Sequence, residues 1–278
     1  MGKESLPDGG TLVLGGTGKT GRRVAELLHR AGRRLRIGSR SAQPPYDWEK
    51  PETWEPALEG MKAAYITYQP DVSLPGALEA LQMFFTAAAA RGVRKLVFLS
   101  ARKYPAAQEV ERALQAATDD WTSLRAGWFN QNFSEYWLLG PILAGALKLP
   151  KGLASEPFVD ADDIAEVAFA ALTEAGHSRQ IYELTGPRAL SFGEAVAEIA
   201  LATGRKIDFL ALSEAEYRAE LLRQGMPAEY HDSVLDAFKL VDGRNTAVCD
   251  GVSRALGRAP RDFSEYARRA AATGVWNK

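Results

Sequence analysis

Glycines placed between an apolar run and a helical pattern constrain the fold of this chain more than any other feature. Residues 12–14 are apolar, glycines follow at positions 15, 16, 18 and 21, and Val24 begins a helical pattern. Gly15 would permit a tight turn after a strand, Gly18 would let the backbone approach a pyrophosphate, and Gly21 would let the helix pack closely. The helix N-terminus would add N–H groups and a partial positive charge. We therefore expect a dinucleotide to contact this stretch through Gly15, Thr17, Gly18, Lys19, Thr20 and Gly21.

Two other interpretations of this stretch exist. Gly18-Lys19-Thr20 imitates the end of a Walker A loop, but that motif needs a glycine at position 13, where the chain has Val13. We set the phosphate-binding loop aside for that reason. A glycine-rich turn without a ligand is the second alternative, and the agreement of strand, spacing and helix favours the dinucleotide over it.

Short β-rich runs alternate with helical patterns over the first 130 residues, which predicts βαβ units and a parallel sheet. The expected strands cover 11–15, 35–38, 63–67, 95–100 and 122–125. Helical stripes lie between them, one at positions 24, 27, 28 and 31 and one at 74, 78, 81, 85 and 88. The sequence therefore predicts an α/β protein with a Rossmann-type doubly wound parallel sheet in residues 1–150.

The rhythm changes after residue 150. A helix at 160–174 and a strand at 181–185 predict that residues 155–187 return to the sheet. Ser191 with Glu194 and Ser213 with Glu216 have the spacing of capping boxes, so each pair marks the start of a helix. Residues 188–278 are expected to form a smaller, mostly helical lobe on the substrate side, with one short strand at 207–212.

Composition excludes several kinds of partner. With 34 Lys+Arg against 35 Asp+Glu, no broad basic surface for nucleic acid is expected. Cys249 is the only cysteine, and His29, His177 and His231 lack metal-ligand spacing, so we expect no disulfide and no metal. Because no apolar run has the length of a membrane span and residues 1–10 are polar, we expect a cytoplasmic protein. A small-molecule substrate remains, and the oligomeric state is left open.

The end of the second strand indicates which nucleotide binds. An acidic residue there would hold the ribose 2′-hydroxyl of NAD, but the chain reads Ile37-Gly38-Ser39-Arg40-Ser41. Ser39 and Arg40 could bind a 2′-phosphate, since a planar guanidinium suits phosphate oxygens. The cofactor predicted is NADP(H); the alternative is that Arg40 is a solvated loop residue.

At these residues the chain resembles the NmrA-like, atypical short-chain dehydrogenase/reductases. More narrowly, it is similar to the ergot-alkaloid-biosynthesis reductases of the festuclavine and agroclavine synthase type and to their bacterial relatives. The stretches that carry the resemblance are 15–21, 46–48, 97–101, 124–133 and 182–187. The resemblance implies a Rossmann core, NADP(H), and delivery of hydride to a C=N, C=C or C=O bond.

The family pattern also implies roles for single residues. It would place Asp47 and Trp48 beside the adenine. Further cofactor contacts, along the ribose and then around the nicotinamide, would come from Tyr68, Gln69, Pro70, Ser100, Gly127 and Trp128. The relatives commonly have proline where this chain has Ala126, which puts the course of the loop that follows in doubt.

The catalytic residues are less clearly marked. Typical members of the superfamily carry a Tyr-x-x-x-Lys pair on the helix after the fourth strand, expected here near 106–117, and that segment has no tyrosine. Tyr46 and Lys50 match the spacing in a proline-bracketed loop, and we interpret this as accidental. The candidates are Ser100, Lys103 and Tyr104, the last two being equally consistent with a solvated loop. Reduction of an iminium carbon would need hydride alone.

An aromatic cluster follows the fifth strand. Open α/β sheets bind ligands at the carboxyl ends of their strands, so these residues could line a pocket for a planar substrate. The candidates are Trp128, Phe129, Asn132, Phe133, Tyr136 and Trp137. Because positions 129, 133, 136 and 137 also have helical spacing, the alternative is that their rings form helix core.

Two functions are compatible with these patterns. One is an NADPH-dependent reductase acting on a small cyclic or aromatic substrate, favoured by the aromatic cluster. The other is a non-catalytic NADP(H) sensor of the NmrA type that acts through a protein partner, favoured by the missing Tyr-x-x-x-Lys pair. Fold alone does not decide between them, but the closer resemblance to biosynthetic reductases also favours the enzyme, so we expect an NADPH-dependent oxidoreductase.

Overall fold

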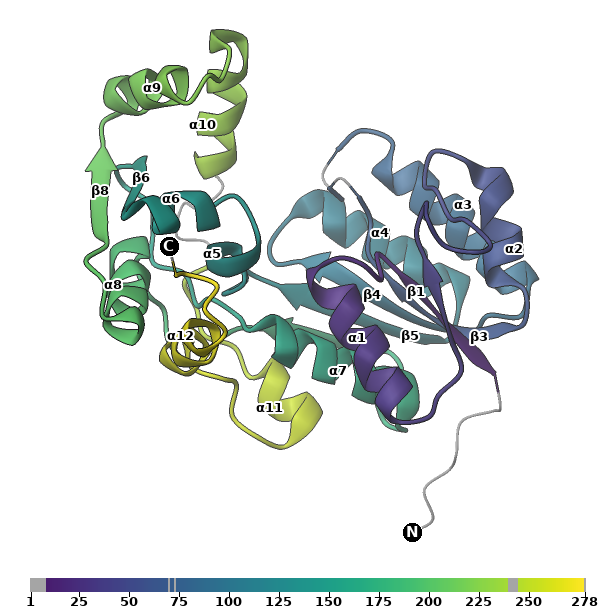
Figure 1. Cartoon of the computed structure of the whole chain (residues 1–278). Coiled ribbons are helices and arrows are strands. Elements are labelled where there is room, and N and C mark those ends of the chain that lie inside the picture. The colour runs from purple at the N-terminus through teal and green to yellow at the C-terminus, as the bar shows by residue number, and fades with distance from the viewer. Residues whose placement is uncertain (1–8, 70, 73, 240–244, 278) are drawn as a thin grey trace. The chain divides into compact units, whose positions relative to one another are not determined.

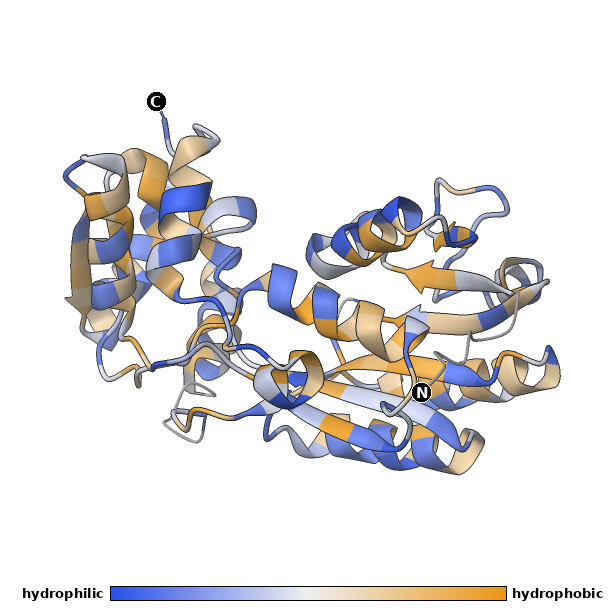
Figure 2. Ribbon diagram, turned by 90° about the horizontal axis from the view of Figure 1, so that it is seen from below, coloured by the Kyte–Doolittle hydropathy of each residue, from blue (hydrophilic) through white to orange (hydrophobic). Residues whose placement is uncertain are grey.

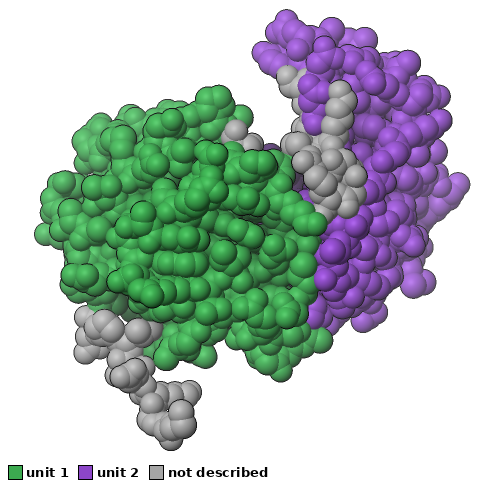
Figure 3. All heavy atoms as spheres, turned by 180° about the vertical axis from the view of Figure 1, so that it is seen from behind, with its two compact units in different colours: residues 1–126, 161–184, 249–259 green, residues 127–160, 185–248, 260–278 purple. Residues whose placement is uncertain are grey.

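The chain forms two compact units, each built from segments that are distant in the sequence (Figure 3). The computed structural model describes residues 9–69, 71–72, 74–239 and 245–277. Unit 1 comprises Met1–Ala126, Ala161–Leu184 and Cys249–Ala259, and unit 2 comprises Gly127–Asp160, Thr185–Val248 and Pro260–Lys278. The units differ from the expected division at 150 and 188, because unit 1 is interrupted at Ala126 and includes a segment near the C-terminus.

Unit 1 is built around a six-stranded sheet in which all neighbouring strands are parallel. The strand order is β2-β1-β3-β4-β5-β7. The strands are β1 (Gly10–Leu14), β2 (Leu35–Gly38), β3 (Met61–Ile66), β4 (Lys95–Ala101), β5 (Asp120–Ala126) and β7 (Gln180–Leu184). This confirms the Rossmann-type parallel sheet and the return of a strand after residue 180.

Helices cover both faces of this sheet. Figure 1 shows α1 (Lys19–Arg30) and α7 (Ala161–Thr173) side by side on one face, and α3 (Ala77–Ala90) and α4 (Pro105–Ala117) on the other. The short elements are η1 (Pro51–Thr53), α2 (Trp54–Leu58) and α11 (Gly251–Leu256), the last packed against α7 and β7. The core combines β1, β3 and β4 side chains with Leu81, Phe84 and Phe85 of α3. In α1, α3 and α4 the buried residues follow the 3.6-residue period, so each contributes one face to the core, whereas α7 is buried over most of its surface.

The start of α3 differs from the sequence expectation. The apolar pattern places Leu74 in the helix, but α3 begins at Ala77, and Leu74 is 46% exposed. Gly76 precedes it with φ +86°, a left-handed conformation that cannot continue a right-handed helix. The apolar pattern therefore extends about one turn beyond the N-terminal end of the helix.

Unit 2 is mostly helical. It contains α5 (Asn132–Glu135), α6 (Leu139–Ala144), α8 (Phe192–Thr203), α9 (Glu214–Arg223), η2 (Ala228–Tyr230), α10 (His231–Lys239) and α12 (Phe263–Ala272). Both capping boxes are present, since Ser191 and Glu194, and Ser213 and Glu216, exchange side-chain and backbone hydrogen bonds. These two predicted helix starts are confirmed.

A small parallel sheet completes unit 2. The expected strand is β8 (Asp208–Leu212), and its partner β6 (Ala146–Pro150) was not predicted. Aromatic side chains fill the core, and the Trp276 indole donates a hydrogen bond to the Phe133 carbonyl oxygen at 2.9 Å. Figure 2 shows hydrophobic and hydrophilic residues alternating along its helices. Among the residues described, no helix is long and apolar enough to cross a membrane.

Candidate nucleotide-binding site

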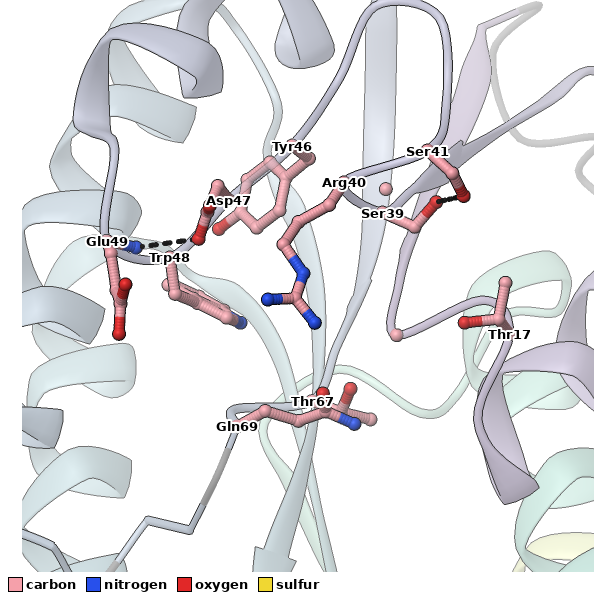
Figure 4. A pocket seen from close by; sticks show the side chains of 12 residues that line it. Thr17, Ser39, Arg40, Ser41, Tyr46, Asp47, Trp48, Glu49, Thr67 and Gln69 are labelled. Carbon is pink, nitrogen blue, oxygen red and sulfur yellow. Dashed lines mark hydrogen bonds between the residues drawn. The ribbon is translucent and has the colours of Figure 1, made fainter.

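A pocket of about 530 Å³ lies in unit 1 at the carboxyl ends of β1, β2 and β3 (Figure 4). β1 lies between β2 and β3, so the chain reverses its direction across the sheet at this point. Such a switch point is where open α/β sheets bind ligands. The pocket is lined by Gly15, Thr17, Gly38, Ser39, Arg40, Ser41, Tyr46, Asp47, Trp48, Glu49, Thr67 and Gln69. It thus brings together residues that the sequence singled out at four separate places.

The glycine turn on one side of this pocket has no room for side chains. Gly15 has φ +64°, and a Cβ there would stand 2.2 Å from Thr67 Oγ1. A Cβ on Gly21 would stand 2.2 Å from the carbonyl oxygen of Gly15. Gly18 is the N-cap of α1, without a side-chain cap, and the first turn of α1 contains no acidic residue. The helix N-terminus therefore offers its positive dipole end to an anion.

Thr67 is a pocket residue that the sequence reasoning missed. Its hydroxyl donates a hydrogen bond to the Leu14 carbonyl oxygen at 3.2 Å, at the point where β1 ends. Thr67 therefore ties the carboxyl end of β3 to the glycine turn. A polar residue directly after a buried strand was the available signal, because parallel neighbours end at the same edge of the sheet.

Arg40 provides the cation of the pocket. Figure 4 shows its side chain extending into the middle, with Ser39 and Ser41 on one side and Asp47 and Glu49 on the other. The Ser39 and Ser41 hydroxyl oxygens lie 3.3 Å apart. Arg40 is exposed and makes no hydrogen bond or ion pair within the described part of the chain. Its guanidinium is thus free for an anionic ligand. Ser41 adds a hydroxyl to which the sequence assigned no role.

A rigid loop with aromatic support forms the opposite wall. Asp47 is held by its backbone, since its N–H donates to Thr53 Oγ1 at 3.0 Å and its carbonyl oxygen accepts the Trp54 indole N–H at 2.8 Å. Its carboxylate accepts the Glu49 N–H at 3.1 Å. The Trp48 ring packs on the half-buried Tyr68 with centroids 5.0 Å apart. The loop therefore presents Asp47 and Trp48 in a fixed orientation.

Tyr46 belongs to this aromatic support. It is 3% exposed, and its ring contacts the rings of Trp48, Trp54 and Phe84. Burial, and then the charge of Asp47, raises the pKa of Tyr46 above its ordinary value. A tyrosine that donates protons through a neighbouring lysine needs the opposite shift. Tyr46 is therefore a packing residue of this wall.

Comparison with known proteins decides the family. No family model matches the chain. The chain is 33% identical over 281 residues to the uncharacterized oxidoreductase YesF of Bacillus subtilis, covering 96% of this chain and 98% of the relative. It is 32% identical to festuclavine synthase II of Penicillium roqueforti, covering 92% and 96%. The chain belongs to the family of the festuclavine synthases and their bacterial relatives.

The chain shares its fold with a solved structure of the NADPH-dependent quinone oxidoreductase QOR2 from Escherichia coli in complex with NADPH. The TM-score is 0.75 at 20% identity, and the match covers 93% of this chain and 99% of that one. At this identity the likeness concerns the fold alone.

Ser100, one of the family positions expected near the nicotinamide, lies at the carboxyl end of β4 in a buried polar network. Its hydroxyl donates to Glu111 Oε1 at 2.6 Å, and the Ser123 hydroxyl donates to the same oxygen at 2.8 Å. Arg125 binds this carboxylate through Nε at 2.9 Å and Nη2 at 2.6 Å. Hydrogen bonding to Glu111 raises the pKa of Arg125. Glu111 was missed, although a glutamate within the apolar stripe of α4 was visible in the sequence.

The network continues to Glu183 on β7. Arg125 Nη1 and Arg102 Nε each lie 3.4 Å from its carboxylate, and the Cys249 thiol lies 3.4 Å from it. Burial acts to raise the pKa of Glu183, but the Cys249 thiol and the Arg102 charge together lower it. Two carboxylates and two guanidinium groups are thus paired at the carboxyl ends of β4, β5 and β7.

The other two catalytic candidates lie just beyond β4. Lys103 is exposed and has φ +55°, a left-handed conformation that is uncommon outside glycine, asparagine and aspartate. Tyr104 is half-buried and is the N-cap of α4. The two residues therefore form a short turn between the end of the strand and the start of the helix.

The remaining family positions fall into separate places. Gly127 and the six candidate substrate residues belong to unit 2. Phe133 is fully buried against Phe158, Phe192 and Phe263, so it is a core residue there. Asn132, Phe129 and Trp128 are half-buried, and Tyr136 and Trp137 are 61% and 40% exposed. Pro70 lies outside the described residues.

Within the described ranges, no group of histidine, cysteine or carboxylate side chains is arranged to hold a metal ion.

Proposed function

We propose that this protein is an NADPH-dependent oxidoreductase that delivers hydride to a C=N, C=C or C=O bond of a small cyclic or aromatic substrate. The observation that carries the proposal is the pocket of unit 1, in which Arg40 extends between the glycine turn and the Asp47 loop (Figure 4). The names of two relatives, an oxidoreductase and a festuclavine dehydrogenase, support a redox function. The sensor alternative receives no support from them.

The residues of the pocket fit a dinucleotide with a 2′-phosphate. Gly15 and Gly21 keep the turn free of side chains, so a pyrophosphate can approach the N-terminus of α1. Ser39, Arg40 and Ser41 supply hydroxyls and a cation for the 2′-phosphate. The carboxylates of Asp47 and Glu49 lie on the other side of Arg40, away from the two serines (Figure 4). NADPH bound to the related fold of QOR2 also supports this cofactor.

Each candidate residue then has a distinct task. Gly18, Lys19 and Thr20 would bind the pyrophosphate, Asp47 and Trp48 the adenine, and Tyr68 and Gln69 the adjoining ribose. Bound there, NADPH supplies the hydride. Lys103 and Tyr104 are the candidates for holding a proton, because the Ser100 hydroxyl proton is engaged by Glu111. Substrate contacts are assigned to the accessible aromatic residues Trp128, Phe129, Tyr136 and Trp137, together with Asn132.

Calorimetry and a substrate panel test this function. Purified protein is titrated with NADPH and NADH, and we expect NADPH to bind at least about tenfold more tightly. Loss of reduced-nicotinamide absorbance is then followed with imines, enones, quinones and aldehydes. No binding heat with either nucleotide would refute the proposal. Tight NADPH binding with no turnover across the whole panel would favour the sensor.

A further inference from the structure

The hydrogen-bond direction at Ser100 is fixed by its surroundings. A hydroxyl has one proton to donate and two lone pairs that accept. A carboxylate has acceptors only, so the Ser100 proton points to Glu111, at an oxygen–oxygen distance of 2.6 Å. Glu111 is 2% exposed. Arg125 donates to both of its oxygens, through Nε to Oε1 at 2.9 Å and through Nη2 to Oε2 at 2.6 Å, which holds the carboxylate in place. The free side of Ser100 therefore offers lone pairs and no proton.

Ser100 lies nearer the carboxyl edge of the sheet than Ser123 does. Ser100 is the residue before the last of β4 and retains 4% of its surface, whereas Ser123 is fully buried. In the β4–β5 register Ser123 pairs with Phe98, two residues farther from the carboxyl edge than Ser100. Two serines thus donate to the same carboxylate oxygen, but they differ in their distance from the ligand-binding edge.

We propose that Ser100 accepts a hydrogen bond from the carboxamide N–H of the nicotinamide, and that Glu111 is the positioning residue that sets this polarity. The inference rests on the proposed function, because it needs a nicotinamide at the carboxyl end of β4. The carboxamide is the group on this ring that carries N–H donors, so it complements a lone pair. Holding the carboxamide fixes the rotation of the ring, and with it the face that is presented to a substrate.

The experiment compares two oxidised cofactors that differ at this group. NADP⁺ has the carboxamide, and its 3-acetylpyridine analogue has a methyl ketone without an N–H donor. Binding of both is measured by calorimetry, without any substrate. For the wild type we expect NADP⁺ to bind roughly two- to tenfold more tightly than the analogue, the range of one hydrogen bond. Failure to bind either compound would refute the proposed function together with this inference.

Three variants show which residues cause the preference for NADP⁺ over the analogue. Ser100→Ala should bind both cofactors equally, because the acceptor is gone. In Glu111→Gln we expect the shortest Arg125 contact, from Nη2, to keep the amide oxygen on its side, so the amide N–H group faces the serines. The Ser100 proton then turns outward, and the preference should vanish or reverse. Ser123→Ala removes a hydrogen bond to the same oxygen from a fully buried site, and it should keep the wild-type ratio.

A merely structural role for the network predicts a different pattern. In that case all three variants would lose thermal stability, and the ratio of the two affinities would stay at its wild-type value in each. An equal affinity of the wild type for both cofactors, with tight binding, would overturn the inference and leave the proposed function intact. If Glu111→Gln does not fold, Ser100→Ala against Ser123→Ala still decides the question.

Discussion

The carbonyl oxygen of Gly15 lies 2.2 Å from the point where a Cβ on Gly21 would stand. A backbone atom cannot move aside as a flexible side chain can, so Gly21→Ala must push α1 away from the glycine turn. We expect a loss of about 1–3 kcal/mol or more in the free energy of unfolding, measured with urea, and loss of nucleotide binding. Gly18→Ala is the matched control, since its Cβ would lie 3.2 Å from the same oxygen. A smaller stability loss at Gly18 than at Gly21 is required.

Arg40 should decide the choice between the two nucleotides. Arg40→Gln removes the cation that faces Ser39 and Ser41 but keeps a polar side chain. NADPH affinity should fall about tenfold or more, while NADH affinity stays within about twofold, because charge-assisted hydrogen bonds to a 2′-phosphate are lost. Arg33→Gln, at an exposed position after α1, makes the same charge change outside the pocket and should alter neither affinity. An equal fall for both nucleotides would contradict the role given to Arg40.

Trp276 should anchor the core of unit 2. The side chain is fully buried, and its indole donates to the Phe133 carbonyl oxygen. Trp276→Ala is expected to lower the free energy of unfolding by about 3–5 kcal/mol. Trp276→Phe keeps most of the apolar contact and loses the hydrogen bond, so its cost should be clearly smaller. Urea titrations of the two variants measure both losses in the free energy of unfolding. Equal losses would show that the packing of the Trp276 ring does not stabilise unit 2.

Asp262 makes the stability of unit 2 depend on pH. Hydrogen bonds from Arg188 hold the pKa of the Asp262 carboxyl well below its ordinary value. An unfolded aspartate titrates near pH ~3.9, so below that pH the unfolded chain binds more protons, and the stabilisation disappears as the pH falls further. Asp262→Asn should therefore be less stable than the wild type at pH 7, by less than about 1 kcal/mol because both partners are partly exposed.

Urea unfolding at several pH values checks the sign of this effect. The stability difference between the wild type and Asp262→Asn should shrink steadily below pH ~4. The control is Asp119→Asn, which changes a carboxyl group that is 92% exposed. It should leave the stability unchanged within about 0.5 kcal/mol at each pH. A difference for Asp262→Asn that grows in acid would contradict the assignment.

The sequence predicts the sheet of unit 1 well, because β-rich runs, glycines and amphipathic stripes indicate the same fold. Two pairs of pocket residues could also be named from the sequence. Ser39 and Arg40 directly follow an expected strand, and Asp47 and Trp48 lie within a stretch that resembles the family. β6 was missed because Leu147 and Leu149 alternate over five residues only, which is too short to separate a strand from a loop. Its partner β8 lies about 60 residues further along the chain, so the pairing is not a local signal.

The roles of Ser100 and Glu111 show a second limit of sequence reasoning. A serine at the end of a strand looks like a free hydroxyl, and a glutamate on a helix looks solvated. Tertiary packing places the two 2.6 Å apart under Arg125, and this contact decides whether the serine can give a proton. The distances between β4, α4 and β5 cannot be read from spacing along the chain.

The interleaving of the two units has a consequence for biosynthesis. β7 and α11 complete unit 1. β7 is encoded after Gly127–Asp160, and α11 is encoded after the whole of Thr185–Val248. A ribosome that has released only the first 126 residues has therefore made a sheet whose β5 edge still lacks its partner strand. Exposed strand edges invite pairing with other chains, so the nascent protein needs shielding on that edge until residue 184 has emerged.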